Sequence, residues 1–269
     1  MQYDPVKNIF AGFIKRSPAL RVLFYKILDL MFLRSWFVRR ELRRVRNSHG
    51  ENHLNILDAG TGYGQYTYFM TGNLEPCSIH AVDVKEDWIN DCREFYSQKR
   101  LNQVTLSVED LTKYSAPESY DLIVCVDVME HIEDDISVFR NFYASLKPGG
   151  RVIINSPSIY GGSDVHDDDD ESFIGEHARD GYSIEDLKEK LEPFGFKVES
   201  ANYTYGFWGD KAWRLGIKYP IIMVNASKVL LAVLPVYYLL TFPFTYIMMQ
   251  LDFRTHSPKG SGIMLTAKK

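Results

Sequence analysis

Residues 55–66 read NILDAGTGYGQY, and this stretch decides the fold. An apolar run typical of a buried parallel strand leads directly into a turn with glycines at positions 60, 62 and 64. Glycine has no Cβ, so the backbone of such a turn can approach a ligand closely. Open α/β sheets bind ligands at the carboxyl ends of their strands, which makes this turn a candidate binding loop.

The chain on either side of this loop alternates between short apolar runs and amphipathic stretches. Further strands are predicted at residues 78–84, 104–109, 120–128, 151–156, 197–205 and 262–267. Helices are expected at residues 64–71, 86–99, 134–146 and 183–191. Strands that alternate with helices indicate an α/β fold with a parallel, doubly wound sheet.

An aspartate stands at or near the end of each of the first four predicted strands, at Asp58, Asp83, Asp110 and Asp127. At its strand end, Asp83 can accept hydrogen bonds from both hydroxyls of a ribose, and Asp110 can accept one from an adenine amino group. Structural alternatives stay open: Asp58 orients the turn, Asp110 caps a helix, and Asp127 forms a turn. The glycines follow GxGxG rather than the dinucleotide pattern GxGxxG, which speaks against an NAD-dependent oxidoreductase.

Five pieces of the sequence, in this order, resemble the class I S-adenosylmethionine (SAM)-dependent methyltransferases: ILDAGTGYG, AVDV, VEDL, YDLIVCVDVMEHIED and LKPGGRVIINSP. The resemblance covers about residues 55–205. It implies a Rossmann-like, seven-stranded sheet in the order 3-2-1-4-5-7-6 with an antiparallel last strand, and SAM as the cofactor. The implied cofactor-binding residues are Asp58, Gly60, Thr61, Gly62, Gly64, Asp83, Val84, Asp110, Leu111 and Asp127.

Each part of the cofactor has an implied place in this set. The loop of residues 60–64 would hold the methionine part, and Asp83 the ribose. Asp110 with Leu111 would hold the adenine. Asp127 would face either the amino group of the cofactor or the methyl acceptor.

The stretch DVMEHIED, residues 127–134, resembles the ubiquinone-type O-methyltransferases within this family. In those proteins a carboxylate-x-x-Glu-His arrangement can hold a divalent ion, here Asp127, Glu130 and His131. Because Asp127 is shorter than the usual glutamate, no metal is expected. His131 is alternatively a general base, or Glu130 and His131 simply begin a helix and orient the loop.

The stretch GEHARDGY, residues 175–182, follows the fifth predicted strand, where this fold covers the acceptor pocket. His177, Arg179 and Tyr182 are candidates to bind or deprotonate an acceptor. Together with His131, His177 and Tyr182 are therefore the predicted catalytic residues. The alternative is a solvated loop that caps the next helix.

Charge is distributed unevenly along the chain. The formal net charge of −4 combines +8 over residues 1–46, −18 over residues 47–205 and +6 over residues 206–269. An acidic centre argues against nucleic acid as a partner, whereas basic, apolar ends suit an anionic membrane surface. Three scattered cysteines and a start without a secretory signal predict a cytoplasmic protein with peripheral membrane contact.

Residues 229–251 carry no charged side chain and are long enough to be considered as a membrane span. Pro235 and Pro243 interrupt this stretch, and a last strand at 262–267 must return to the sheet. We therefore expect residues 206–255 to form an insertion that lies in one leaflet. Residues 20–46 predict one basic amphipathic helix with a single apolar stripe: Phe24, Leu28, Met31, Val38, Leu42 and Val45. Alternatively, both segments pack on each other as a lid.

The sequence thus predicts four parts. They are a basic amphipathic extension (1–50), a SAM-binding core (51–205), a hydrophobic insertion (206–255) and the last strand of the core sheet (256–269). The expected function is methyl transfer, preferably to oxygen, onto a hydrophobic or membrane-associated small molecule such as a quinone-type phenol, an aryl lipid or a lipid head group. The alternatives are a non-catalytic cofactor-binding membrane scaffold and, less favoured, an NAD-dependent oxidoreductase.

Overall fold

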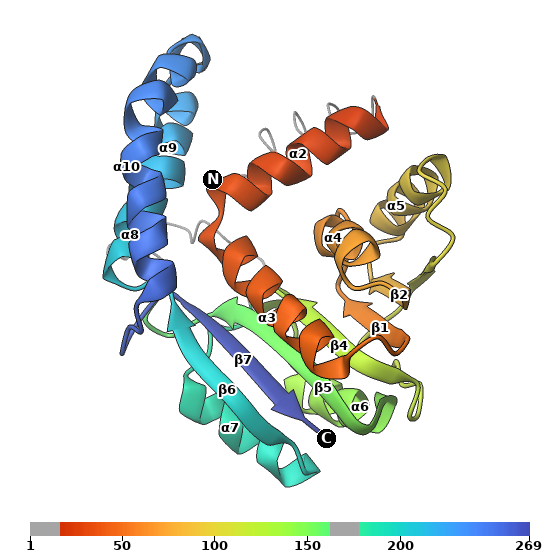
Figure 1. The fold of residues 1–269 in the computed structure, drawn as a ribbon. Coiled ribbons are helices and arrows are strands. Elements are labelled where there is room, and N and C mark those ends of the chain that lie inside the picture. Colours follow the sequence, from red (N-terminus) through yellow and green to blue (C-terminus); the bar gives the residue numbers. More distant parts are fainter. Residues whose placement is uncertain (1–16, 162–177) are drawn as a thin grey trace.

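The computed structural model describes residues 17–161 and 178–269. Within these ranges the chain forms a seven-stranded sheet in the order β3-β2-β1-β4-β5-β7-β6, which confirms the expected order (Figure 1). The strands are β1 (Leu54–Ala59), β2 (Cys77–Asp83), β3 (Val104–Val108), β4 (Tyr120–Val126), β5 (Leu146–Pro157), β6 (Lys197–Thr204) and β7 (Gly262–Lys268). The strands β1 to β5 run parallel to one another, and β7 pairs antiparallel with both β5 and β6.

Helices cover both faces of this sheet, which explains why β1 is apolar without alternation. On one face, α3 (Leu33–His49) and α4 (Gln65–Asn73) pack against side chains such as Ile56 of β1. On the other face, α6 (Asp135–Ser145) and α7 (Ile184–Leu191) enclose side chains such as Leu57. Beyond β2, α5 (Glu86–Gln98) forms a smaller cluster with α2 (Pro18–Met31).

The amphipathic extension differs from the single helix that the sequence predicts. It consists of two helices, α2 and α3, because the chain leaves helical geometry at Phe32. The second half of the predicted stripe lies in the protein core, where Val38 and Leu42 are 0% exposed. The periodicity correctly identifies an apolar face, but that face packs on the sheet, so the membrane prediction is wrong for α3.

Two of the arginines of α3 bind to other parts of the protein, whereas Arg43 and Arg44 are exposed. Arg39 forms an ion pair with Asp29 of α2 at 2.7 Å. Arg46 donates to the backbone carbonyl of Leu74 at 3.0 Å. Arg39 and Arg46, which the sequence predicts at a membrane surface, therefore bind to the protein itself.

The predicted insertion between β6 and β7 is a helical hairpin that extends away from the sheet (Figure 1). Its elements are α8 (Phe207–Trp213), the π-helical turn η3 (Arg214–Lys218), α9 (Tyr219–Ala226), the 3-10 turn η4 (Lys228–Ala232) and α10 (Leu234–Arg254). Pro243 lies inside α10 without ending it. In the described part of the chain, no helix has the length and apolar character needed to cross a membrane.

Aromatic rings join the base of this hairpin to the core. Phe253 of α10 packs against Phe37 of α3 with ring centroids 5.1 Å apart, and Trp36 packs against Tyr246 at 5.4 Å. The hairpin therefore rests on the same helix that covers the sheet.

Candidate functional site

The loop between β1 and α4 has the shape that the glycines predict. Gly60, Gly62 and Gly64 have φ values of +87°, +53° and +79°, which belong to the left-handed region. A Cβ at Gly60 would stand 2.2 Å from a methyl group of Val128, in the loop after β4. The backbone N–H groups of Gly60 and Thr61 both donate to the carbonyl of Val82, at 2.9 and 2.8 Å. The loop is thus fixed against the ends of β2 and β4.

Asp58 supports this loop from inside the protein. Its side chain is 3% exposed, and its carboxylate accepts a hydrogen bond from the Thr67 hydroxyl of α4. That hydroxyl lies 3.0 Å from the hydroxyl of Thr61. Burial raises the pKa of Asp58 to about 6. Asp58 therefore orients the loop through Thr67, which agrees with the structural alternative given for it above.

Asp83 connects the glycine loop to the end of β2. One carboxylate oxygen accepts from the backbone N–H of Gly62 at 2.9 Å, and the other accepts from that of Lys85 at 3.0 Å. Next to it, Val84 is 67% exposed, which is unusual for an apolar side chain at a strand end. A charged acceptor beside an exposed apolar surface suits a ribose with an attached base.

Asp110 and Leu111 lie in the turn after β3. The Asp110 carboxylate accepts from the backbone N–H and the hydroxyl of Thr112, at 3.0 and 2.7 Å, and pairs with Lys113 at 3.1 Å. The bonds from Thr112 lower the pKa of Asp110. Leu111 is 7% exposed and packs in the core. The carboxylate thus caps its own turn, as the structural alternative expects, and 43% of its side chain remains accessible.

Asp127 follows β4 with a φ of +51°, which is uncommon for a residue other than glycine. Its carboxylate forms an ion pair with Arg34, which comes from α3. Arg34 could not be identified from the sequence, because no local pattern connects two residues this far apart in the chain.

Glu130 and His131, the other two residues of the metal alternative, lie in different surroundings. Glu130 is 1% exposed, its carboxylate accepts from the Ser156 hydroxyl at 3.1 Å, and burial raises its pKa. His131 is exposed in the 3-10 turn η1 (Met129–His131). Among residues 17–161 and 178–269, no group of three or more His, Cys, Asp or Glu side chains is arranged to hold a metal ion. The Asp127–Glu130–His131 metal alternative finds no support in this geometry.

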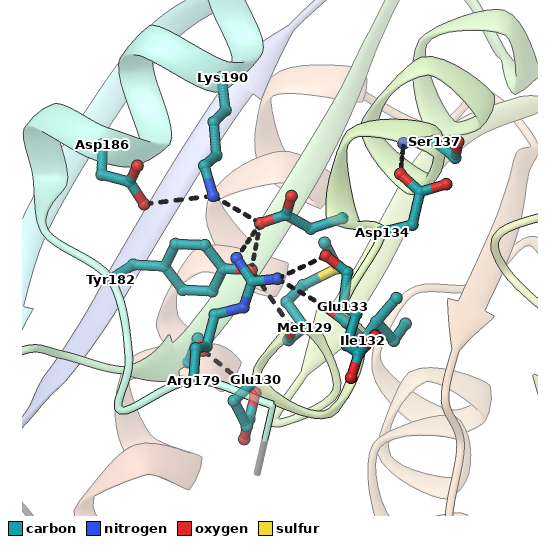
Figure 2. Close-up of polar contacts among 12 residues, drawn as sticks. Met129, Glu130, Ile132, Glu133, Asp134, Ser137, Arg179, Tyr182, Asp186 and Lys190 are labelled. Carbon is teal, nitrogen blue, oxygen red and sulfur yellow. Dashed lines mark hydrogen bonds and ion pairs between the residues drawn. The ribbon is translucent and has the colours of Figure 1, made fainter.

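Residues 178–182, at the start of the second described range, bind to the loop after β4 and to the first residue of α6, as Figure 2 shows for Arg179 and Tyr182. Lys190 of α7 donates to the same carboxylate, that of Asp135. Tyr182 is 0% exposed, and its hydroxyl donates to Asp135 at 2.8 Å. Burial and the neighbouring carboxylate raise the pKa of Tyr182. Arg179 donates to the carbonyl of Ile132 at 2.7 Å and pairs with Asp135.

This network corrects the predicted role of Tyr182. A core hydroxyl bound to Asp135 positions the loop rather than meeting an acceptor, and Arg179 shares that structural task. His177, the third residue of that prediction, lies outside the described residues.

Comparisons with known proteins agree with the fold. Residues 57–152 match a family model described as a methyltransferase domain. The chain is 33% identical over 100 residues to phosphoethanolamine N-methyltransferase 3 of Arabidopsis thaliana, a match that covers 37% of this chain and 20% of that protein. It is 28% identical over 148 residues to malonyl-[acyl-carrier protein] O-methyltransferase 2 of Ilyobacter polytropus, covering 53% and 54%.

A solved structure shows the same fold. Phosphoethanolamine N-methyltransferase 2 of Haemonchus contortus, in complex with SAM, superposes with a TM-score of 0.60 at 18% identity, covering 96% of this chain and 59% of that one. The chain spans between one fifth and about half of the length of the two curated relatives above. The strand order and this superposition show a Rossmann-like methyltransferase fold, and residues 57–152 within it match the methyltransferase-domain model.

Proposed function

We propose that this chain binds SAM at the ends of β1 and β2 and transfers its methyl group to a small-molecule acceptor. The observation that carries the proposal is the bond between the Gly62 N–H and the Asp83 carboxylate. It joins a glycine loop, which a ligand can approach closely, to an acidic group placed for a ribose.

The residues that would hold the cofactor fit its chemistry. Asp83 keeps unused acceptor capacity on both oxygens for ribose hydroxyls, because a carboxylate offers about four lone-pair sites. Val84 offers an apolar contact for the base, and Asp110 an acceptor for its amino group. The loop of residues 60–64 would surround the methionine part. Thr61 and Asp58 both contact the Thr67 hydroxyl and so stabilise the conformation of this loop.

The cofactor supplies an already activated methyl group on a sulfonium ion. The protein must then align the acceptor with that methyl and accept a proton. His131 is the described residue that we propose for proton transfer, because it is exposed beside the loop after β4. His177 remains a second proposal for the same role.

The acceptor is proposed to be hydrophobic or membrane-associated, such as a quinone-type phenol, an aryl lipid or a lipid head group. Oxygen remains our preferred target atom. The relatives named above include both an N-methyltransferase and an O-methyltransferase, so their names do not decide between nitrogen and oxygen.

Support for a membrane-associated acceptor comes from the hairpin. Its exposed apolar side chains include Val229, Leu239, Leu240 and Phe244, which are 78%, 76%, 64% and 64% accessible. Residues 219–251 carry a single charged side chain, Lys228. Soluble monomers rarely expose apolar patches of this kind, and such patches mark membrane or protein contacts. We propose that the hairpin lies in one leaflet of an anionic membrane.

Incubation with methyl-labelled SAM and a lipid extract tests the enzymatic part of the proposal. The expected result is label in an extractable lipid with the wild-type chain, and none with Asp83→Ala. Binding of the cofactor product without transfer to any extract would favour the non-catalytic scaffold.

A further inference from the structure

A small basic pocket lies at the base of the helical hairpin, where α10 meets α3 and β6 (Figure 1). Its volume is about 70 Å³. Pockets that enclose whole small molecules measure roughly 300–1,000 Å³, so this one admits only a small group. Its lining includes three basic side chains and no acidic one: Phe37, Arg40, Asn202, Tyr203, Phe253, Arg254, Thr255 and His256.

Arg40 is held in the pocket by two aromatic rings. Its guanidinium lies over the rings of Phe37 and Phe253, 4.9 and 4.7 Å from their centroids. Its Nη1 also donates to the backbone carbonyl of Phe253 at 3.3 Å. The carboxylate of Glu41 lies 3.5 Å from both Arg40 and Arg44, so two arginines share one negative charge. Because a guanidinium carries five N–H donors, Arg40 keeps donors for a further acceptor.

Three other polar side chains of the pocket have no partner within the protein. In the part of the chain that the structure describes, the side chains of Asn202, Arg254 and His256 form no hydrogen bond or ion pair. Arg254 ends α10, and both Arg254 and His256 are exposed. Arginine binds phosphate through two parallel N–H···O bonds, and imidazole and amide N–H groups add further donors. The pocket therefore offers donors that fit the oxygens of a phosphate group.

The pocket begins where the apolar surface of the hairpin ends. Leu251 is 40% exposed, and Arg254 follows it three residues later in the same helix. At 1.5 Å per residue the two are about 4.5 Å apart along the helix axis. Tyr246 is also 40% exposed and packs against Trp36. Aromatic and basic side chains beside an apolar surface are typical of the level of lipid head groups in a membrane.

The pocket also lies at the same end of the sheet as the glycine loop. Strands β5 and β6 both pair antiparallel with β7, so they run parallel to each other and to β1. Asn202 lies near the carboxyl end of β6, which ends at Thr204. A membrane bound at the pocket is therefore close to the end of the sheet at which we propose that methyl transfer takes place.

From these contacts we propose that Arg40, Arg254 and His256 bind the phosphate group of an anionic phospholipid while the hairpin lies in the leaflet. The acyl chains of this lipid lie along the exposed apolar side chains of α10, and its phosphate group enters the pocket at the end of the helix. The site thereby fixes the depth and orientation of the hairpin. This inference rests on the proposed membrane contact and adds a lipid-binding site to it.

The test measures binding to vesicles of phosphatidylcholine with and without phosphatidylglycerol. The neutral variant combines Arg40→Met with Arg254→Met, and the lysine variant combines Arg40→Lys with Arg254→Lys, which keeps the charge but loses the planar fork. Lys99→Met combined with Lys197→Met is the matched control. Both lysines are exposed and lie outside the pocket, after α5 and at the start of β6. Urea unfolding verifies that each variant is folded.

We expect the neutral variant to bind vesicles that contain phosphatidylglycerol about 10- to 30-fold more weakly than the wild type. The lysine variant should remain at least about threefold weaker than the wild type, because lysine cannot form the bidentate contact. The control should stay within about twofold of the wild type. On vesicles of phosphatidylcholine alone, the wild type and the neutral variant should bind alike, because these vesicles hold no anionic lipid.

Unchanged affinity of the neutral variant for the anionic vesicles would overturn the inference. Full recovery in the lysine variant would also overturn it, because general electrostatic attraction would then suffice. Titration of the wild type with inorganic phosphate, without vesicles, tests the other source of the same chemistry. Saturable phosphate binding that the neutral variant loses, with its vesicle binding unchanged, would assign the pocket to a soluble phosphate. A folded wild-type chain that binds neither kind of vesicle would instead refute the proposed membrane contact itself.

Discussion

Asp83 shows how one side chain can shape a loop and offer a binding surface at the same strand end. Its two oxygens accept from the backbone at Gly62 and Lys85. Removing the carboxylate therefore affects both the loop geometry and the proposed ribose contact. Replacement by Asn separates these effects in part, because Asn keeps one acceptor oxygen.

We predict that Asp83→Ala weakens S-adenosylhomocysteine binding at least tenfold, because charge-assisted bonds are worth about 1.5–3 kcal/mol each. Asp83→Asn should lie between the wild type and Asp83→Ala. Asp121→Asn is the control, since Asp121 also accepts a backbone N–H, that of Asn55 at 2.8 Å, but at the start of β4. Titration calorimetry checks all three, and equal affinities in Asp83→Ala and the wild type would contradict the assignment.

The raised pKa of Asp58 predicts that the stability of the protein depends on pH. Its pKa is raised from the ordinary value of 3.8 to about 6 in the folded protein, so the native state holds a proton that the unfolded chain releases. The resulting stabilisation is complete below pH 3.8 and is lost as pH rises through about 6. Asp58→Asn lacks this titration.

Urea unfolding of the wild type and Asp58→Asn at pH 4 and pH 7 measures the effect. Relative to the variant, the wild type should lose up to roughly 3 kcal/mol of unfolding free energy between these two values. A difference that does not change with pH would show that Asp58 titrates normally.

At the level of elements, Tyr182 illustrates the difference between a residue near a site and a residue in it. It joins the segment before α7 to Asp135, the first residue of α6. We predict that Tyr182→Phe lowers the unfolding free energy by about 1–2 kcal/mol, since a buried hydrogen bond is lost. S-adenosylhomocysteine affinity should remain within about twofold of the wild type.

The same variant distinguishes a structural role from a catalytic one. Unchanged stability together with a loss of methyl transfer would restore Tyr182 as a catalytic residue. Tyr143→Phe is a suitable control, because Tyr143 is also an aromatic residue packed against the core cluster.

The elements also show what local sequence patterns can and cannot predict. The strands were predictable because β1 and β4 are buried on both faces, so that apolar residues such as Ile56 and Leu57 follow one another without alternation. The strand order followed from the resemblance of the motifs to a known family. The burial of Val38 and Leu42 was not predictable, since periodicity identifies an apolar face but not what covers it.

The site was predictable to a similar degree. The glycine loop and Asp83 come from contiguous motifs and lie together as expected. Arg34 approaches Asp127 only because α3 packs across the sheet, and that contact depends on tertiary packing alone. Tyr182 was misassigned because its position in the chain does not reveal that its side chain points into the core.

For the whole molecule, the hairpin raises the question of what covers its apolar surface. We predict that the wild-type chain sediments with anionic vesicles, and that Leu239→Asn combined with Leu240→Asn weakens this binding at least tenfold. Burial of each leucine side chain is worth about 1.5–3 kcal/mol, which makes the loss large. Ile136→Asn is the control, because Ile136 is 44% exposed on α6, outside the hairpin.

Salt and detergent separate the contributions to vesicle binding. High salt should release only part of the protein, because an apolar anchor is not screened, whereas detergent should release all of it. Equal sedimentation of the wild type and the double variant would remove the hairpin from the membrane, and self-association of the wild type without vesicles would point to a second copy as its partner.

One binding measurement decides whether the ends of β1 and β2 form a SAM site. Titration calorimetry of the wild-type chain with S-adenosylhomocysteine and, separately, with NAD distinguishes the two cofactor classes. We predict binding of S-adenosylhomocysteine and no detectable binding of NAD. Binding of NAD alone, or of neither ligand by a folded chain, would show that these strand ends are not a SAM site.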